Sequence, residues 1–219
     1  MSKTLGNVID PYSLVDEYGV DPVRYFLLRE VPFGLDGDFS RQAMIGRINS
    51  DLANDLGNLF SRVIAMVHKY FQGVIPCANV HEAIDETLKD KTREVIKTVD
   101  ACMNQLAFNR ALVSVWELIG LLNKYIDETA PWVLAKDNAK RERLATVMVG
   151  ILEALRLVSV LLSPFMPASC EKMWQAIGGG KPVTEQHLTA CKEWSTVNPG
   201  TRIQKISPLF PRIETGSAS

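Results

Sequence analysis

Apolar residues recur at helical spacing over most of the chain, which is typical of helices that bury one face. Long helices are predicted over about residues 40–72, 82–104 and 108–129, and from just after Asp137 to about Leu162. Pro167 opens a shorter helix that the glycines at 178–180 end. The connections are mostly short, which favours antiparallel neighbours. We therefore predict a mainly α fold, built as an antiparallel helix bundle.

Two short helices are expected before this bundle. Asp10-Pro11 and Asp21-Pro22 each place a capping carboxylate directly before a proline, the residue preferred at the first helical position. Gly19 ends the first helix and Val31-Pro32 ends the second. A turn or short strand follows, so residues 1–39 are interpreted as a compact connecting module.

The rest of the chain divides into two parts. Residues 40–190 carry the helical pattern, whereas residues 191–219 contain Pro, Gly and Ser with little periodicity and end in a flexible tail. The most apolar stretch, Leu144 to Phe165, is long enough to raise the question of a membrane span. Glu153 and Arg156 would each cost about 2.5 to 3.5 kcal/mol near its centre. A buried bundle helix without membrane contact is therefore expected.

A polar row is predicted on the first long helix. At about 100° per residue, Asn54, Asn58 and Arg62 fall on the side opposite the apolar face. Two amides and a planar cation in line suit the edges and faces of unstacked bases. The alternative is an ordinary solvated face on which Arg62 pairs with Asp55 or Asp51. The residues expected on the opposite, core face are Leu52, Leu56, Leu59, Val63, Val67 and Tyr70.

Trp132 favours the binding interpretation of that row. Pro131 breaks the helix just before it, so the indole is expected at a corner of the bundle. An exposed Trp is a stacking platform worth about 1 to 3 kcal/mol per base. Trp116 and Trp174 lie at apolar helical positions and are expected in the core.

Composition limits the possible partners. The 219 residues carry a formal net charge of −1, which argues against a general basic field for nucleic acid, so any such contact would be local. No Cys-x-x-Cys pair or histidine ligand spacing occurs, so no metal site is predicted and the thiols are expected to be reduced. The N-terminus lacks a signal-peptide pattern, and a cytoplasmic location is expected.

The first seven residues contain a possible phosphate-binding loop. Lys3 lies between Ser2 and Thr4, and Gly6-Asn7 follows as a turn. One mobile ammonium with short hydroxyl donors suits a transferring phosphate group, although such residues also form ordinary surface turns. The stretch resembles the Lys-Met-Ser-Lys-Ser loop of class I aminoacyl-tRNA synthetases, without its first lysine and with Thr4 at its fifth position.

Several further stretches carry a more specific resemblance over nearly the whole length. They are Tyr18 to Tyr25, Asp36 to Phe39, Leu52 to Leu59, Ala130-Pro131-Trp132 and Leu209 to Ile213. Together with the first eleven residues, they resemble the C-terminal part of bacterial methionyl-tRNA synthetases. The row from Asn54 to Arg62, the Pro-Trp pair and Leu-Phe-Pro-Arg-Ile distinguish this family from other class I synthetases.

The resemblance implies a role for each part. Residues 1–39 would be the loop remnant and a stem-contact module, residues 40–190 the anticodon-binding domain, and residues 191–219 a segment that packs toward the catalytic domain and then a tail. The partner would be the anticodon stem-loop of tRNA(Met), with anticodon CAU. The implied anticodon readers are Asn58, Arg62 and Trp132, supported by Asn54 and Pro131.

The resemblance also implies what the chain lacks. In the full enzyme Lys3, assisted by Ser2 and Thr4, would stabilise the ATP phosphates, with ATP-Mg and methionine as substrates. The N-terminal catalytic domain of the same polypeptide is absent from this sequence, and positioning by such a domain supplies much of the catalysis. The chain by itself is therefore expected to be inactive and to hold no cofactor.

Two alternatives remain open. One is the equivalent domain of a synthetase for isoleucine, valine, leucine or cysteine, which shares the loop and the bundle. The other is a helical protein-interaction scaffold without a nucleic-acid role, which the near-zero charge would suit. A fully buried Trp132 would remove the stacking argument and favour the scaffold.

Overall fold

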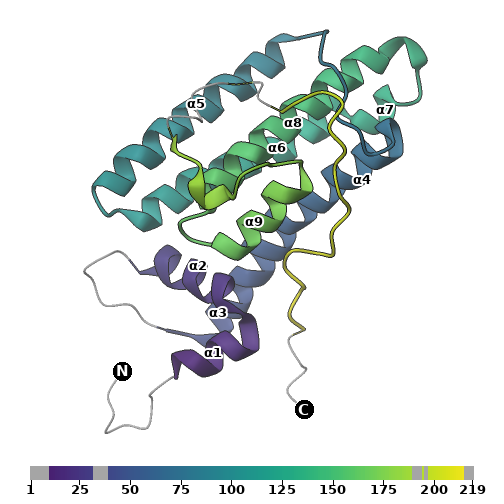
Figure 1. The fold of residues 1–219 in the computed structure, drawn as a ribbon. Helices are drawn as coiled ribbons and strands as arrows, with labels where there is room; N and C mark the ends of the chain where they lie inside the picture. Colours follow the sequence, from purple (N-terminus) through teal and green to yellow (C-terminus); the bar gives the residue numbers. More distant parts are fainter. Residues whose placement is uncertain (1–9, 32–38, 189–193, 195–196, 215–219) are drawn as a thin grey trace, which may run out of the picture.

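The computed structural model describes residues 10–31, 39–188, 194 and 197–214, and its regular elements are helices (Figure 1). The N-terminal helices are α1 (Pro11–Tyr18) and α2 (Val20–Glu30). A long helix follows in three parts, α3 (Arg41–Arg47), the π-helical η2 (Ile48–Asn58) and α4 (Leu59–Phe71). The remaining elements are α5 (Ala83–Asn104), α6 (Phe108–Thr129), α7 (Pro131–Leu134), the 3-10 turn η3 (Asn138–Lys140), α8 (Arg141–Leu162), α9 (Pro167–Ala176) and the 3-10 turn η4 (Val183–Glu185).

Helix α8 forms the centre of the bundle. Figure 1 shows it beside α5 and α6, and α4 and α9 also pack on it. The helical stretch Asn138–Leu162 is long and apolar enough to cross a membrane, but 94% of its most apolar window is buried inside the structure. It is therefore the core helix, as predicted, and the antiparallel α-helical bundle is confirmed.

Glu153 and Arg156, the two charged residues in the apolar part of α8, form an ion pair. Arg156 Nη2 lies 2.7 Å from Glu153 Oε1, and the Glu153 side chain is fully buried. The second carboxylate oxygen of Glu153 accepts a hydrogen bond from the backbone N–H of Val197 at 3.0 Å. The buried pair thus also ties the C-terminal part of the chain to the core helix.

The predicted cap of the second helix is wrong. Asp10 caps α1 as expected, accepting from the N–H of Tyr12, but α2 begins at Val20, directly after Gly19 with φ 86°. Asp21 is therefore inside the first turn, and its carboxylate accepts from the N–H of Ser169 at 2.6 Å. Because that N–H belongs to the first turn of α9, Asp21 caps a helix that is distant in sequence.

The N-terminal helices pack directly on the bundle. The Arg24 guanidinium donates to the backbone oxygens of Pro164 and Phe165, which follow α8. Tyr25 Oη donates to Asp51 Oδ2 at 2.6 Å. Burial, and then the neighbouring Asp51 carboxylate, raise the pKa of Tyr25, so the phenol remains a donor. The turn predicted over residues 33–39 lies almost entirely outside the described residues.

The first long helix differs from its prediction in winding. It begins at Ser40, whose hydroxyl accepts from the N–H of Ala43, and ends at Gln72 with φ 56°. Its middle eleven residues, however, form a π-helix rather than an α-helix. A π-helix bonds i to i+5 and turns through less than the α-helical angle per residue. The 100° projection used for the polar row therefore does not apply across η2.

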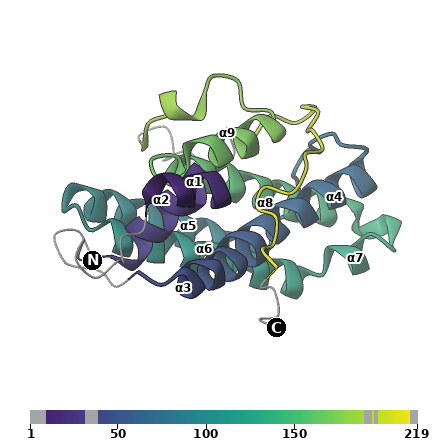
Figure 2. The ribbon, with the colours of Figure 1, turned by 90° about the horizontal axis from the view of Figure 1, so that it is seen from below.

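Residues 197–214, here called the C-terminal strap, run along this long helix toward its N-terminal end (Figures 1 and 2). The strap pairs with the loop after α4 through Thr201 O and Ile75 N–H at 2.9 Å, and through Ile203 N–H and Gly73 O at 2.8 Å. The Asn49 side chain then bonds both the N–H and the carbonyl of Ile213. Packing toward a catalytic domain stays a prediction.

Candidate nucleic-acid interface

Two amides of the predicted row lie exposed on η2. Asn54 and Asn58 are both exposed, whereas Leu52 and Leu56, on the opposite side, are fully buried. Asn54 Nδ2 donates to Asp55 Oδ1 at 3.1 Å. The apolar residues hold the helix against the bundle and leave amide groups directed to solvent, where they can act as both donors and acceptors.

Arg62 lies in the first turn of α4 and contacts a residue that the sequence did not suggest. Its Nη2 is 3.6 Å from Asp127 Oδ1 near the end of α6, and its side chain is 37% exposed. The alternative partners Asp51 and Asp55 are engaged elsewhere, Asp51 by Tyr25 and Asp55 by Asn54. Arg62 therefore connects the polar row to Asp127 near the end of α6. Asp127 lies four residues before Pro131 in the sequence.

Trp132 lies at a corner, as predicted. Helix α6 ends at Thr129, Ala130 takes a left-handed conformation with φ 42°, and the buried Pro131 opens the short α7. The chain therefore changes direction and leaves the Trp132 side chain 41% exposed, with Val133 50% exposed beside it. Because the indole is not buried, it can stack on an unpaired base.

Trp116 and Trp174, the two tryptophans predicted in the core, are less exposed than Trp132. Trp174 is 7% exposed and donates to the carbonyl of Lys181 at 2.8 Å. Trp116 is partly buried, packed against the core with its ring centroid 4.5 Å from that of Tyr25. The sequence therefore separated the corner tryptophan correctly from these two.

Helix α6 is also tied to the polar row through Asn123. Its Nδ2 donates to Ile119 O at 3.2 Å and to Asp55 O at 3.5 Å, so it bridges α6 and η2. Burial raises the pKa of Asp55, and the Asn54 hydrogen bond opposes that shift. The candidate residues thus offer amides, a guanidinium and an indole, which are groups for binding rather than for covalent or acid-base catalysis.

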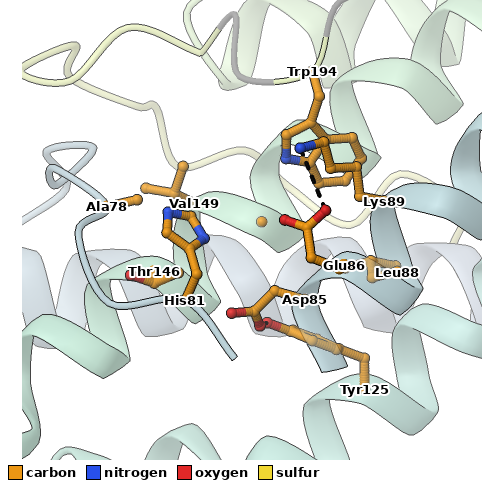
Figure 3. Close-up of a pocket in the computed structure, with 11 residues that line it drawn as sticks. Ala78, His81, Asp85, Glu86, Leu88, Lys89, Tyr125, Thr146, Val149 and Trp194 are labelled. Atoms are coloured by element: carbon orange, nitrogen blue, oxygen red, sulfur yellow. Dashed lines mark hydrogen bonds and ion pairs between the residues drawn. The ribbon is translucent and has the colours of Figure 1, made fainter. Parts of the chain in front are cut away.

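A separate pocket of about 270 Å³ lies between α5, α8 and the loop before α5 (Figure 3). Asp85 lies at its base and accepts two hydrogen bonds from Arg143, at 2.6 and 2.9 Å, and one from Tyr125 at 2.5 Å. Burial opposes ionisation of Asp85, but the Arg143 and Tyr125 hydrogen bonds outweigh it and lower its pKa. Figure 3 shows Glu86 and Lys89 paired near Trp194.

The Asp85 cluster was missed by the sequence analysis. The one available signal was the carboxylate at Asp85, in the first turn of a helix, where it accepts from the N–H of Glu82 at 2.8 Å. Its partners Tyr125 and Arg143 come from two other helices, and no spacing in the sequence relates them. The cluster joins α5, α6 and α8 and is therefore read as a structural element of the bundle.

Two further predictions concern the phosphate-binding loop and the absence of a metal site. Ser2, Lys3 and Thr4 lie outside them, so the phosphate-binding role stays a prediction. Within the described residues, no group of three or more His, Cys, Asp or Glu side chains is arranged to hold a metal ion. Cys77, Cys102 and Cys170 form no disulfide with one another, and burial raises the pKa of the Cys170 thiol.

Comparison with known families first defines the class of protein. Residues 1–64 match the family described as tRNA synthetases class I (M). Residues 75–218, which make up most of the chain, match the anticodon binding domain of methionyl tRNA ligase. The chain belongs to this family of methionyl-tRNA ligase anticodon-binding domains.

Individual relatives agree with this assignment. The chain is 51% identical over 215 residues to the methionine-tRNA ligase of Caldanaerobacter subterraneus, covering 98% of this chain and 33% of that protein. It is 48% identical over 214 residues to the Fusobacterium nucleatum enzyme, covering 98% and 34% respectively. The chain therefore spans about a third of the length of these relatives.

Solved structures share the fold. The Mycobacterium tuberculosis methionyl-tRNA synthetase in complex with methionyl-adenylate matches with a TM-score of 0.90 at 37% identity, over 97% of this chain and 41% of that one. The apo form of the same enzyme matches with a TM-score of 0.88 at 35% identity, over 94% and 41%. The described helices thus have the arrangement found in these synthetases.

Proposed function

We propose that this chain recognises the anticodon stem-loop of tRNA(Met), with anticodon CAU, as the anticodon-binding part of a methionine-tRNA ligase. The observation that carries the proposal is the exposed side chain of Trp132 at the α6–α7 corner. Arg62 contacts Asp127, which lies near the end of α6, just before this corner. Membership of the anticodon-binding family supports it. A fully buried indole, which would have removed the stacking argument, is not found.

Each side chain has a role that follows from its chemistry. Trp132 would stack on a base that has left the loop stack, and the buried Pro131 fixes the corner from which the indole projects. Arg62 would offer its guanidinium plane and its donors, either to a base or to a phosphate. Asn54 and Asn58 would bond base edges, since each amide presents both a donor and an acceptor.

The charge of the chain supports a local contact. With 24 Lys and Arg against 25 Asp and Glu, no general positive field draws nucleic acid to the protein. Affinity would then come from stacking and base-edge bonds rather than from many phosphate contacts. Binding should accordingly depend less on salt than it does for a basic RNA-binding protein, while discrimination between anticodons remains strong.

The larger protein would attach methionine to tRNA(Met) in the bacterial cytoplasm. In that reaction, Lys3 with Ser2 and Thr4 would stabilise the phosphates of ATP-Mg, and methionine would bind in a domain that this chain does not contain. The N-terminal catalytic domain would thus be a partner within the same polypeptide. We expect the isolated chain to release no pyrophosphate from ATP and methionine, which a coupled assay would measure.

The test is fluorescence anisotropy with a labelled CAU stem-loop and hairpins that carry single anticodon changes, at low and moderate salt. The intact chain should prefer CAU. Trp132→Ala should weaken CAU binding by roughly 5-fold to 150-fold, corresponding to about 1 to 3 kcal/mol of lost stacking. Tyr12→Ala is the matched control, because Tyr12 is an aromatic side chain, 80% exposed, on a different helix.

Two further pairs of variants separate the polar groups. Arg62→Ala should weaken binding, whereas Arg93→Ala, which removes an ion-paired arginine from α5, should not. Asn58→Ala should reduce discrimination, whereas Asn104→Ala removes an exposed amide from α5 without effect. Equal binding of all hairpins, unchanged by Trp132→Ala, would contradict the proposal and favour the scaffold. Preference for an isoleucine anticodon would favour the other class I alternative.

A further inference from the structure

The C-terminal strap touches the π-helical segment at both of its ends. Near the beginning, Asn49 Nδ2 donates to Ile213 O at 2.9 Å, and Asn49 Oδ1 accepts from Ile213 N–H at 2.8 Å. Near the end, the ring of Phe210 lies over Gly57 and is 6% exposed. The two exposed amides of the candidate interface, Asn54 and Asn58, thus lie within or beside a segment that the strap holds at two points.

Gly57 and Phe210 meet near the end of the π-helical segment. A Cβ atom on Gly57 would lie 2.9 Å from the carbonyl oxygen of Leu52, which is too close for the wide π-turn to tolerate. The turn therefore requires glycine at this position, and glycine leaves the inner surface of the helix without a side chain. Phe210 packs against the helix there, since its Cδ2 atom would be 3.7 Å from a Cβ on Gly57, an ordinary van der Waals distance. Packing that is complete on this side stabilises the turn.

The winding of η2 decides where the amides point. A π-helix places successive side chains at a smaller rotation than an α-helix does, so a return to α-helical winding would rotate Asn54 relative to Arg62. π-Turns are rare and occur mostly where neighbouring structure stabilises them. A contact that favours π winding therefore also sets the relative orientation of the side chains proposed to meet the anticodon.

We propose that Phe210 and Asn49 are positioning residues for anticodon recognition, which act by holding η2 in its π-helical form through the C-terminal strap. This inference rests on the proposed function of the Asn54, Asn58 and Arg62 row. Neither Phe210 nor Asn49 contacts the RNA in this scheme. Their effect is on the choice between anticodons rather than on binding as such.

The test compares Phe210→Ala with Ile203→Ala in the full 219-residue chain. Ile203 is an equally buried residue of the same strap, 2% exposed, but its backbone pairs with Gly73 beyond α4 rather than with η2. Both substitutions should lower thermal stability. Only Phe210→Ala should reduce the ratio of affinities for CAU and single-change stem-loops, by about tenfold or 1.4 kcal/mol.

A second measurement reports on the stability of η2 itself. Amide hydrogen exchange of residues 52–58, measured well below the unfolding transition, should become about tenfold faster in Phe210→Ala, which is an opening free energy lower by about 1.4 kcal/mol. Ile203→Ala should leave exchange of these amides unchanged. Phe210→Leu, which restores most of the apolar volume, should recover both slow exchange and discrimination.

Asn49→Ala is a milder variant, and it tests the same inference if Phe210→Ala fails to fold. It removes two hydrogen bonds from a half-buried side chain and should produce the same loss of discrimination to a smaller degree. If the intact chain prefers CAU and Phe210→Ala and Asn49→Ala keep the full preference, the strap inference is overturned while the proposed function stands. If the intact chain itself shows no preference, the proposed function fails and the inference about recognition fails with it.

Discussion

The α5–α6 helix pair and the long helix made of α3, η2 and α4 belong to one bundle, but their shapes have different origins. Helices α5 and α6 are each 22 residues long and α-helical throughout. The long helix changes its winding for eleven residues and is fastened to a strap more than a hundred residues away in sequence. Regular helices thus follow local pattern, whereas an irregular one depends on what packs against it.

The largest effect should come from the charge cluster that joins α5, α6 and α8. Asp85 and Arg143 have side chains only 12% and 9% exposed, so removing the Asp85 charge leaves the buried Arg143 paired only with Glu82, whose side chain is 58% exposed. Asp85→Asn should lower the free energy of unfolding by about 3 kcal/mol, measured by urea denaturation at pH 7. Asp90→Asn, from an exposed pair on the same helix, should change it by less than about 1 kcal/mol.

Acid should remove the same contribution. The folded pKa of Asp85 lies below its ordinary value, so its stabilisation is fully present above about pH 4, the unfolded pKa, and is lost as the pH falls through the folded pKa. The stability difference between wild type and Asp85→Asn should therefore shrink below about pH 4. Urea denaturation at pH 7, 5 and 3 would measure this. A difference that is constant with pH would contradict the assigned ionisation.

Replacing a glycine by alanine should change the free energy of unfolding in opposite directions in the two helices. Gly57→Ala brings a Cβ against the Leu52 carbonyl and should destabilise the protein by about 2 kcal/mol. Gly120→Ala, in α6, would meet no atom within 4 Å beyond its own stretch of helix and should stabilise it by about 0.5 to 1 kcal/mol. Thermal unfolding of the two variants would test the comparison directly, and stabilisation by Gly57→Ala would show that the π-turn yields easily.

The smallest effect on stability should come from the ion pair that joins α4 of the long helix to α6. Arg62 and Asp127 are 3.6 Å apart with side chains 37% and 67% exposed, so water and salt screen their attraction. Asp127→Asn should change the free energy of unfolding by less than about 1 kcal/mol, and less still at high salt. A loss comparable with that of Asp85→Asn would mean that this pair holds α4 and α6 together.

Much of the candidate interface was predictable from local signals. The proline at 131 predicted the corner, and the corner predicted an exposed Trp132. Apolar spacing also predicted which side of the first long helix is buried, from Leu52 to Val67. That prediction survived the change in winding because the apolar residues are frequent enough to line the inner side of either helix.

Other features depended on contacts that no local pattern records. Asp21 has the sequence context of a cap for its own helix, yet it caps α9, because α2 packs against the start of that helix. Asp51 and Asp55 are the acidic residues before Arg62 on its own helix, but neither is three or four residues away, the spacing at which helical side chains meet, and Arg62 instead contacts Asp127 of α6 at 3.6 Å. In both cases an unrelated segment competes successfully for a polar group.

The sequence by itself determined the helical bundle, the bounds of α5 and α6, and the exposure of Asn54, Asn58 and Trp132, since turn residues and apolar period act over a few neighbours. Only the tertiary structure decided the π winding of η2, the partner of Arg62 and the course of the strap. These depend on residues such as Phe210 and Ile213, which meet η2 only after the chain has folded. A π-helix is rare by local preference, so packing against distant segments has to favour it before it forms.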